Sequence, residues 1–296
     1  MPPIADAIAA FEANRSLLMG LAYRILGSRA DAEDAVQDTF LKWSEADHAT
    51  IDNAASWLTT ACTRRCIDVL RSAHRSRVDY VGSWLPEPIH TAVDDMLAEH
   101  ALLASSLGTA FLLMLERLTP KERAAYLLHE IFDRPYPEIA SILDMQETAC
   151  RKLVSRAREN IEKTHVRHVT PRPQQEQLLA AFESAVLSGD TSGLAGLLAE
   201  DIALRADGGG KVTAVREVLH GKQRVLDFLA VMQRYWSDYR WVFMEINGSR
   251  GLSLEDDDGE SVASVTFDYD DAGRVRDIFI MRNPDKLGRL HAPPIT

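Results

Sequence analysis

Cysteine is scarce in this chain, and its three residues do not form the pattern of a metal site. Cys62 and Cys66 stand four residues apart on one face of an expected helix, and Cys150 stands alone. No further ligand lies at the spacing that a zinc site requires. We therefore expect buried cysteines in a reducing compartment, without a metal or another cofactor, since free cysteine packs like a small hydrophobic residue.

Long apolar runs are also missing. Residues 1–15 lack the basic start and the apolar segment of a signal peptide. The longest uncharged stretch, Ala101–Leu115, contains Ser105, Ser106 and Gly108 and is too short to cross a bilayer. The sequence thus predicts a core helix in this stretch and a cytoplasmic protein that does not associate with a membrane.

A positive net charge is absent as well, because the formal net charge is −11. This argues against a protein that coats nucleic acid with a generally basic surface, since affinity for phosphate grows with the local number of cations. The charges are segregated, however. Basic residues gather in 64–77 and again in 147–163. Two basic helices in an acidic protein favour DNA binding at chosen sites with the help of a partner.

One stretch has the pattern of a helix-turn-helix. Thr119 and Glu122 form a capping box around a proline at the first helical position, so a helix begins here. The two prolines of Arg134–Pro137 end it, because proline cannot donate a backbone hydrogen bond inside a helix. Two helices, over 137–143 and 147–163, then follow with a short turn between them. Such a turn before an arginine-rich helix is typical of a DNA-binding motif.

The turn and the packing positions agree with this interpretation. Asp144 stands where such turns usually have glycine, and aspartate tolerates left-handed dihedrals better than most residues. An ordinary bundle with a solvated basic helix is the alternative, because basic faces alone are common. The residues expected to face a shared core are Ile139, Ala140, Ile142, Cys150, Leu153 and Val154.

The segment PEIASILDMQETACRKLVSRAR resembles the promoter-binding end of bacterial extracytoplasmic-function sigma factors, whose last helix closes with Ser-Arg-Ala-Arg. The family usually has Thr-Val entering this helix, whereas this chain has Ala149-Cys150, which bears on base preference and not on docking. The resemblance implies that the helix enters the major groove of the −35 promoter element. Arg151 and Lys152 are then expected to read base edges, because recognition helices read with their N-terminal residues, and Arg156 and Arg158 to hold phosphates. The predicted −35 contacts are Thr148, Arg151, Lys152, Ser155, Arg156 and Arg158.

The N-terminal helices carry a second resemblance. Apolar spacing predicts a helix over 4–26, which Gly27 ends, and a second helix that Ser28 caps. The acidic face of the second helix is an ordinary solvated surface in one interpretation. In the other, it is similar to the helix with which this sigma family docks on the clamp of RNA polymerase. The predicted polymerase contacts are Asp34, Gln37, Asp38, Phe40, Leu41 and Trp43.

A third helix, capped by Asn53, is predicted over 54–77. Its segment WLTTACTRRCIDVLRSAHR is similar to the part of sigma factors that melts and reads the −10 promoter element. Melting needs cations for the strand backbone and a surface that receives unstacked bases. Trp57 is a candidate for stacking, although core packing is the stronger expectation. The predicted −10 contacts are Arg64, Arg65, Arg71 and Arg75.

Three further motifs point to a subgroup of this family. Residues 78–93 break the helical pattern and predict an inter-domain linker that contains WLPEP at 84–88. With DGGGK at 207–211 and NPDKL at 283–287, it matches the signature of sigma factors that carry a SnoaL-like extension. The glycine loop lacks the spacing of a phosphate loop and no helix follows it. The resemblance implies that the extension regulates the protein in cis, by packing on the first domain and the linker, in place of a separate anti-sigma factor. The predicted regulatory residues are Trp84, Leu85, Pro86, Asp207, Gly208, Gly209, Gly210, Lys211, Asn283, Pro284, Asp285, Lys286 and Leu287.

The C-terminal part of the chain has an α+β pattern. Helices are predicted over 174–188 and 223–235, with a short helical piece that runs to Glu200 and a hairpin turn at 270–273. Helices followed by a curved antiparallel sheet resemble the NTF2-like cone of SnoaL-type proteins. The predicted strands are Ile202–Ala206, Val212–Val215, Trp241–Ile246, Ser261–Tyr269 and Val275–Met281.

The predicted protein is thus multidomain, with two all-α sigma domains followed by an α+β SnoaL-like cone. Its expected parts are a sigma-2 helical bundle over 1–77, a linker over 78–93, a sigma-4 helix-turn-helix domain over 94–165, a linker over 166–173 and the SnoaL-like domain over 174–296.

The resemblance implies an initiation factor that binds the β′ and β subunits of core RNA polymerase and brings them to promoter DNA. Two alternatives remain for the cone: NTF2-like folds also host isomerases and cyclases, and an apolar cone suits a small-molecule sensor. The available chemistry is His220, Tyr235, Asp268 and Tyr269, which form no spaced pair, so no catalytic residue is predicted.

Overall fold

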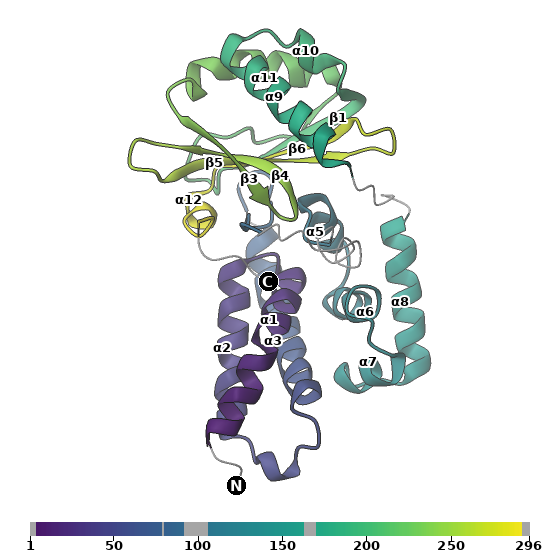
Figure 1. Cartoon of the computed structure of the whole chain (residues 1–296). Helices are drawn as coiled ribbons and strands as arrows, with labels where there is room; N and C mark the ends of the chain where they lie inside the picture. The colour runs from purple at the N-terminus through teal and green to yellow at the C-terminus, as the bar shows by residue number, and fades with distance from the viewer. Residues whose placement is uncertain (1–3, 79, 92–105, 163–169, 292–296) are drawn as a thin grey trace. The chain divides into compact units, whose positions relative to one another are not determined.

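The computed structural model describes residues 4–78, 80–91, 106–162 and 170–291, except for the side chains of 4–5, 73–78 and 162. These residues fold as two compact units (Figure 1). The described residues of 4–78 and 114–162 form the first unit. Those of 80–91, 106–113 and 170–291 form the second.

The first unit begins with three helices, α1 (Ile4–Leu26), α2 (Arg29–Glu45) and α3 (Ala54–Val78), with the short 3-10 turn η1 (His48–Thr50) before α3. The predicted caps are confirmed, because Ser28 Oγ accepts from the Asp31 amide at 3.2 Å and Asn53 Oδ1 accepts from the Ser56 amide at 3.0 Å. The predicted burial of the cysteines is also confirmed. The core between these helices is filled by Leu18, Leu21, Ile25, Val36, Leu58, Cys62 and Cys66.

The same unit continues with α6 (Pro120–Glu130), α7 (Tyr136–Ile142) and α8 (Glu147–Glu162). The capping box of α6 is confirmed: the Glu122 amide donates to Thr119 Oγ1 and the Thr119 amide donates to Glu122 Oε2. The chain leaves α6 after Glu130 and reaches α7 through the proline segment, as expected. These helices place the turn before α8 on a rigid base.

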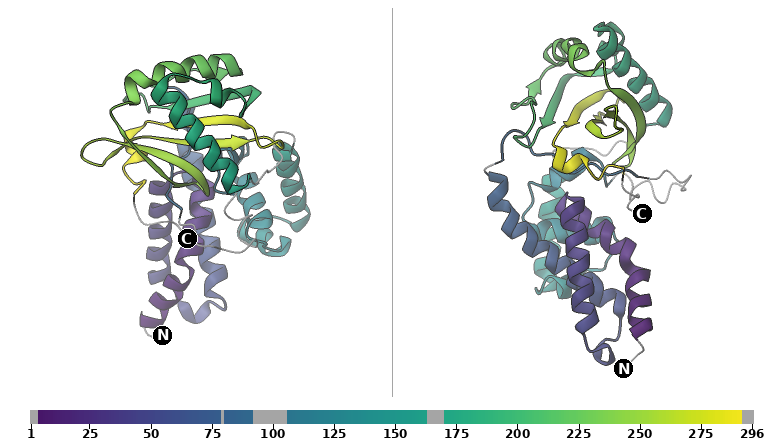
Figure 2. Two further views of the ribbon diagram at one scale, coloured as in Figure 1. Left: turned by 45° about the horizontal axis from the view of Figure 1, so that its top comes forward. Right: turned by 90° about the vertical axis from the view of Figure 1, so that its left-hand side faces the viewer.

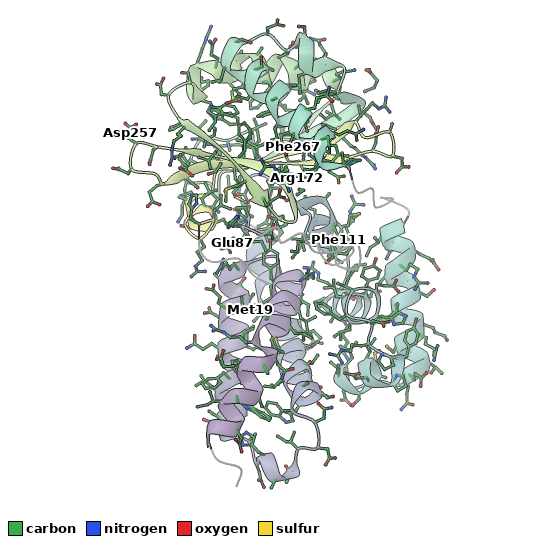
Figure 3. All side chains as sticks on the ribbon, viewed as in Figure 1. Met19, Glu87, Phe111, Arg172, Asp257 and Phe267 are labelled. Atoms are coloured by element: carbon green, nitrogen blue, oxygen red, sulfur yellow. The ribbon has the colours of Figure 1, made fainter. Side chains whose placement is uncertain are left out.

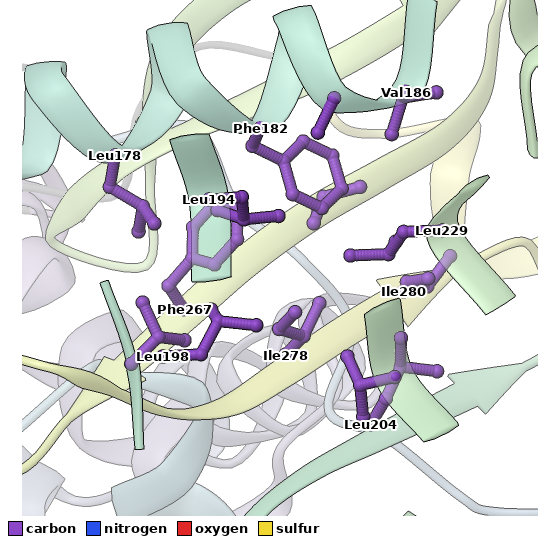
Figure 4. Close-up of a cluster of buried hydrophobic side chains, with 14 of the residues drawn as sticks. Leu178, Phe182, Val186, Leu194, Leu198, Leu204, Leu229, Phe267, Ile278 and Ile280 are labelled. Atoms are coloured by element: carbon purple, nitrogen blue, oxygen red, sulfur yellow. The ribbon is translucent and has the colours of Figure 1, made fainter. Parts of the chain in front are cut away.

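The second unit contains a six-stranded sheet in the order β2-β1-β6-β5-β4-β3. Its helices α9 (Arg172–Ser188), α10 (Ser192–Ala195) and α11 (Lys222–Trp236) lie on one face, and the sheet curves around them (Figure 2). The strands are β1 (Leu198–Asp207), β2 (Leu219–His220), β3 (Arg240–Ile246), β4 (Ser249–Glu255), β5 (Ser261–Tyr269) and β6 (Val275–Met281). Phe182, Leu229, Phe267 and Ile278 meet between helices and sheet (Figure 4). The predicted α+β class of this part is therefore confirmed.

The other face of the sheet is covered by pieces from elsewhere in the chain. Leu85 of the linker packs with Phe279 and Met281 of β6 and with Leu287 of α12 (Pro284–Leu287). Ala110, near the start of α5 (Thr109–Leu115), joins this cluster. The Thr109 and Thr266 hydroxyls lie 3.1 Å apart. The linker is therefore part of the folded core of the second unit.

Several predictions of secondary structure were wrong, each for a reason of tertiary pairing. No strand forms at Val212–Val215, because the edge of β1 pairs instead with Leu219 and His220. The short helix ends before Glu200, since Leu198 already pairs with Val275 of β6. The sheet is mixed and not antiparallel throughout, because β1 and β6 run parallel.

Like β2, strand β4 was not predicted. It is joined to β3 by the two-residue turn Asn247-Gly248, both at positive φ. Asn-Gly is the strongest short signal for such a hairpin, so the sequence did contain the evidence for this strand. Of the predicted core helix Ala101–Leu115, the described part is helical only from Thr109, and residues 101–105 lie outside the described residues. None of the helices in the described ranges combines the length and apolarity needed to cross a membrane.

Candidate functional site

Helices α7 and α8 form the expected helix-turn-helix. Asp144 in the turn has φ 50°, the left-handed conformation that glycine usually supplies. The Met145 amide donates to the Ala140 carbonyl at 3.0 Å and closes the turn. The six expected packing positions are all buried: Ile139, Ala140, Ile142, Cys150, Leu153 and Val154.

The outward face of α8 combines polar and basic side chains. Thr148, Lys152 and Ser155 are exposed and lie opposite the buried face of the helix. Lys152 has no hydrogen-bond or ion-pair partner among the described residues. The helix therefore presents a continuous polar stripe that can enter a groove of DNA.

The three predicted arginines of α8 all have acidic partners. Arg151 donates through Nε and Nη2 to Glu147, at 2.9 and 2.6 Å, and stacks on the ring of Tyr136. Arg156 lies 3.8 Å from Glu122, and Arg158 pairs with Glu130. Because these arginine side chains are roughly half exposed, the ion pairs are weak and phosphate can replace the carboxylates.

The basic face of α3 is engaged within the first unit. Arg64 donates from Nε to the Ile142 carbonyl at 2.8 Å and from Nη2 to the Ser141 carbonyl at 3.0 Å, both at the end of α7. Arg65 pairs with Asp38 at 2.6 Å, and Arg71 lies 3.5 Å from Asp68. The side chain of Arg75 lies outside the described residues. Contact with a DNA strand would thus require Arg64 to exchange carbonyl partners for phosphates.

The predicted polymerase contacts on α2 fall into two groups. Asp34, Gln37 and Leu41 are exposed, and Leu41 has 51% of its surface accessible although it is apolar. Phe40 packs on Phe11, with 4.8 Å between ring centroids. The exposed residues form an acidic and apolar stripe along α2. The contact between Phe40 and Phe11 holds α2 against α1.

Trp43 belongs to the core instead. It is buried, and its indole Nε1 donates to the Ala7 carbonyl at 2.8 Å. Its ring centroid lies 5.3 Å from that of Trp57, which is half-buried. Trp57 therefore packs on the core, as expected.

In the second unit, the three signature motifs meet at Asp207. This carboxylate has no exposed surface and accepts from the Tyr80 hydroxyl at 2.6 Å, the Leu85 amide at 2.9 Å, the Gly209 amide at 2.9 Å and Lys286 Nζ at 2.8 Å. Burial, and then the neighbouring carboxylate of Asp207, raise the pKa of Tyr80 above its usual range. The linker, the glycine loop and the C-terminal motif thus share one buried charge.

The ammonium group of Lys286 completes this cluster. It also donates to the Leu85 carbonyl at 2.6 Å and lies 4.5 Å from the centroid of Trp84 and 5.0 Å from that of Tyr80. A cation between two aromatic faces and a carboxylate is held from several sides. Lys211, by contrast, pairs with Asp285 at the surface.

The glycine loop is shaped by this packing. Gly209 has φ 62°, and a Cβ atom there would lie 2.5 Å from Asn283. A Cβ at Gly208 would lie 2.6 Å from the Val212 carbonyl oxygen, and one at Gly210 would lie 3.3 Å from Val81. The loop therefore needs glycine for close contact with the linker and the C-terminal motif.

Two further residues of this region, Tyr80 and Asn247, lie outside the sequence motifs. Tyr80 contacts Asp207 and accepts from Asn283 Nδ2 at 2.9 Å. Asn247, in the β3–β4 turn, exchanges backbone and side-chain hydrogen bonds with Ile89 of the linker. The Asn-Gly pair is the signal that could have pointed to Asn247, whereas nothing in the sequence marked Tyr80.

The candidate catalytic side chains of the second unit do not form a site. His220 is exposed on β2, and Tyr235 has 65% of its surface accessible on α11. Tyr269 is buried, with a hydroxyl that has no partner in the described chain, and burial raises its pKa. Phe267 lies on the helix side of the sheet, whereas Asp257 lies at the tip of the β4–β5 hairpin (Figure 3). The region between sheet and helices is filled with aromatic and aliphatic side chains.

A groove of about 320 Å³ lies between linker residues Val81–Gly82 and the loop 208–216. Lys211 and Arg216 contribute to its lining. Within the described ranges, no group of three or more histidine, cysteine, aspartate or glutamate residues is placed to hold a metal ion.

Comparison with known proteins agrees with this arrangement. The Sigma-70 region 2 family matches residues 10–76, and the Sigma-70, region 4 family matches residues 109–161. The ECF RNA polymerase sigma factor SigJ of Mycobacterium tuberculosis is 40% identical over 233 residues, which cover 77% of this chain and 74% of the relative. The probable ECF RNA polymerase sigma factor SigI of the same species is 30% identical over 286 residues, 96% of each chain. The crystal structure of Mycobacterium tuberculosis SigJ covers 94% of this chain and 97% of its own, with 30% identity and a TM-score of 0.73.

Proposed function

The chain belongs to the extracytoplasmic-function sigma factors of RNA polymerase, and from this premise we propose roles for its individual surfaces. It is a transcription initiation factor that binds core polymerase and directs it to particular promoters. Its mechanism is binding and not catalysis, so the task is divided between helices that contact polymerase and helices that contact DNA.

Helix α8 reads the −35 element in this proposal. The observation that supports it is the polar stripe of Thr148, Lys152 and Ser155 on a helix that follows a left-handed turn. Arg151 and Lys152 contact base edges, because they stand near the start of the helix. Arg156 and Arg158 exchange their glutamate partners for phosphates.

Helices α2 and α3 serve the polymerase and the −10 element. Asp34, Gln37 and Leu41 form the exposed part of the polymerase contact, with Asp38 and Phe40 beside them and Trp43 supporting the helix from the core. Arg64, Arg65, Arg71 and Arg75 supply cations to the melted strand. Contacts to the β′ and β subunits, and a cytoplasmic location, follow from the proposed partnership with core polymerase.

The third domain, residues 174–296, is taken to be SnoaL-like. In this proposal it regulates the sigma domains in cis. The supporting observation is the buried Asp207, which holds the linker through Tyr80 and Leu85 and the C-terminal motif through Lys286. Packing on the first domain is the further part of this proposal. A domain that holds the linker can take the place of a separate anti-sigma factor, because it limits how the sigma domains move apart. We propose no catalysis for it, since its candidate catalytic side chains are not gathered.

The groove beside the linker supports a second candidate function for this domain, that of a small-molecule sensor. A ligand between Val81–Gly82 and the loop 208–216 would contact both the linker and the third domain. Its binding would therefore change the hold of the domain on the linker.

Run-off transcription with purified core polymerase tests these proposals. The full chain should start RNA synthesis at its promoter, and a chain that ends at about residue 170 should show altered polymerase affinity or promoter activity. A chain that ends at about residue 282 lacks Lys286 and should behave like the chain that ends at about residue 170. A full chain that neither binds core polymerase nor starts RNA synthesis would refute the assignment of surfaces. Identical behaviour of all three chains would refute regulation in cis alone.

A further inference from the structure

We propose that Tyr136 is a positioning residue for promoter recognition and that it acts through Arg151. This inference rests on the proposed reading of the −35 element by α8. Tyr136 is the first residue of α7, the helix before the turn, and it was not among the residues that the sequence motifs indicated.

The guanidinium group of Arg151 is held from two sides. Its central carbon lies 4.3 Å from the centroid of the Tyr136 ring. Its Nε and Nη2 atoms both donate to one carboxylate oxygen of Glu147. An ion pair four residues apart on an exposed helix orders a side chain only weakly. The aromatic ring adds a surface that fixes the position and tilt of the guanidinium plane.

Tyr136 itself has a defined place. It is half-buried, and its ring centroid lies 4.2 Å from that of His129 on α6. His129 Nδ1 lies 3.2 Å from the Arg134 carbonyl oxygen, in the segment that leads to α7. Helices α6, α7 and α8 thus each contribute one group to a stack of His129, Tyr136 and Arg151. The stack connects the start of α8 to α6 and α7.

This arrangement leaves the end of the arginine fork available. Glu147 occupies the side formed by Nε and Nη2, and Nη1 has no partner among the described residues. The pair Nη1 and Nη2 is the edge that can donate two parallel hydrogen bonds to O6 and N7 of guanine. A side chain already held in place loses less conformational entropy on binding. Tyr136 therefore makes Arg151 a more selective reader of guanine.

Promoter binding by the reconstituted holoenzyme tests this role. A panel of promoters, each with one −35 base pair changed, is titrated with wild type, Arg151→Ala, Tyr136→Phe, Tyr136→Ala and the double variant Tyr136→Ala/Arg151→Ala. Tyr136→Phe is the matched control, because it keeps the ring and removes only a hydroxyl that has no hydrogen-bond partner in the described chain. Thermal unfolding of each free variant reports on folding.

Arg151→Ala should lose about tenfold in discrimination at one G·C base pair, which is within the range of a bidentate contact. Tyr136→Ala should lose several-fold at the same base pair and keep its preference at the others. Tyr136→Phe should behave as wild type. The double variant should lose no more than Arg151→Ala alone, because the two residues act through one contact.

Three results would overturn the inference. In the first, Tyr136→Ala discriminates between bases as well as wild type while Arg151→Ala does not. That result would exclude the role of Tyr136 and leave the proposed function intact. A uniform loss at every base pair with a lower unfolding temperature would show that Tyr136 only stabilises the domain. If Arg151→Ala itself keeps full discrimination, the proposed −35 role of Arg151 fails as well.

From separate contacts we also infer that Asn247 couples two segments of the chain, residues 89–91 of the linker and residues 106–108. Asn247 is buried, and its Oδ1 accepts from the Ile89 amide at 3.2 Å while its own amide donates to the Ile89 carbonyl at 3.0 Å. Its Nδ2 donates to the Leu107 carbonyl at 3.0 Å. One side chain thus bonds chain segments on both sides of residues 92–105.

Neighbouring hydrogen bonds strengthen the first of these ends. The Thr91 amide donates to the Glu245 carbonyl at 3.1 Å, and the Gly248 amide donates to Thr91 Oγ1 at 3.0 Å. Together with the isolated β-bridge between His90 and Ile246, they pair the linker with the edge of β3. At the other end, the Leu107 carbonyl accepts from the Asn247 amide group. Asn247 therefore couples Ile89 and Leu107 through one side chain.

Hydrogen exchange of the full chain tests the coupling. Asn247→Gly keeps the left-handed backbone (φ 54°) and removes the side-chain hydrogen bonds to Ile89 and Leu107. Asn247→Asp keeps the acceptor for Ile89 but turns a second acceptor toward the Leu107 carbonyl. Asp271→Gly, in the exposed β5–β6 turn, is the control.

Asn247→Gly should speed exchange about tenfold or more at residues 89–91 and also at 106–108, with β5 and β6 unchanged. Asn247→Asp should affect mainly 106–108, and Asp271→Gly should affect neither end. Faster exchange at one end only in Asn247→Gly, or at neither, would overturn the coupling without touching the assignment as a sigma factor.

Discussion

Asp207 shows how much one buried carboxylate can organise. Four donors from three separate segments converge on it, and its cation partner Lys286 has only 13% of its side-chain surface exposed. Removing one partner of a buried ion pair is costly, because the remaining charge is buried without compensation. Lys211 of the glycine loop forms a surface pair with Asp285 of α12, in which both side chains are more than half exposed. Both ion pairs join a lysine to an aspartate, so the difference between them is the extent of burial.

Asp207→Asn should destabilise the second unit by about 3 kcal/mol, since Lys286 keeps its charge and loses its counter-ion. The asparagine amide would also face the Leu85 amide and Lys286 with donors of its own. Urea unfolding followed by tryptophan fluorescence measures the change. Asp285→Asn, in the exposed pair, is the matched control and should change the free energy of unfolding by less than about 0.5 kcal/mol. Equal effects of the two substitutions would contradict the buried role of Asp207.

Gly209→Ala should cost more than about 1 kcal/mol, because alanine would occupy a left-handed backbone and its Cβ would overlap Asn283. Gly193, in α10, has no atom within 4 Å of an added Cβ and no positive φ. Gly193→Ala should therefore be neutral or slightly stabilising. Thermal unfolding of both variants checks the difference. A Gly209→Ala protein as stable as wild type would show that the loop can move away from the C-terminal motif.

At the scale of elements, α8 illustrates how a helix separates its functions by face. One face is buried against α6 and α7, the opposite face carries Thr148, Lys152 and Ser155, and Arg156 and Arg158, which have glutamate partners, lie along the borders. The sequence indicated the helix, its start and its basic character. It did not indicate which cations have partners, because Glu122 and Glu130 come from another helix. Arg158 and Arg156 are thus placed beside the reading face and not on it.

Arg158→Ala should weaken binding of the holoenzyme to all promoters by a similar factor and lower the slope of log K against log salt by about 1. Arg158 is a proposed phosphate contact, so no base preference should change. Titrations at three salt concentrations, on the −35 panel described above, measure both quantities. Arg172→Ala, which removes an exposed arginine of α9 with a similar ion pair to Glu176, is the control. A changed base preference in Arg158→Ala would argue against its assignment as a phosphate contact.

At the scale of the whole molecule, the linker is the part whose character changes most between sequence and structure. Its composition predicts a tether, yet Leu85 and Ile89 are fully buried in the second unit. Trp84 and Tyr80 enclose Lys286, and Asn247 holds Ile89. The third domain is therefore folded around a segment that precedes the helix-turn-helix by some distance in the chain. This shared core is the observation on which the proposed regulation in cis rests.

Amide exchange in the linker should follow the third domain. We expect Leu85 and Ile89 to exchange as slowly as the strands of the sheet, since both segments are released only when the second unit opens. Hydrogen-exchange mass spectrometry on the full chain, compared with a chain that ends at about residue 170, measures this. The truncated chain should exchange these amides at the rate of an unstructured peptide. Fast exchange in the full chain would show that the linker detaches while the sheet stays folded.

The sequence by itself determined the features that depend on neighbours in the chain. The capping box of Thr119 and Glu122, the turn at Asp144 and the helical faces of α1 to α3 are local, so spacing and residue type suffice to predict them. The motifs around Arg151, Trp84, Asp207 and Lys286 were equally readable. They indicated the family, which comparison with relatives then showed.

Only the tertiary structure decided what depends on contacts between distant segments. It joined β1 to β6 in parallel, buried Trp43 against Ala7 and brought Tyr80 and Lys286 to one carboxylate. It also placed Tyr136 under Arg151 and Asn247 between Ile89 and Leu107. Hydrogen bonds of this kind can join residues 201 positions apart, as Lys286 and Leu85 show, and no local pattern encodes them. Which side chains are held and which can reach DNA is therefore a property of the folded chain.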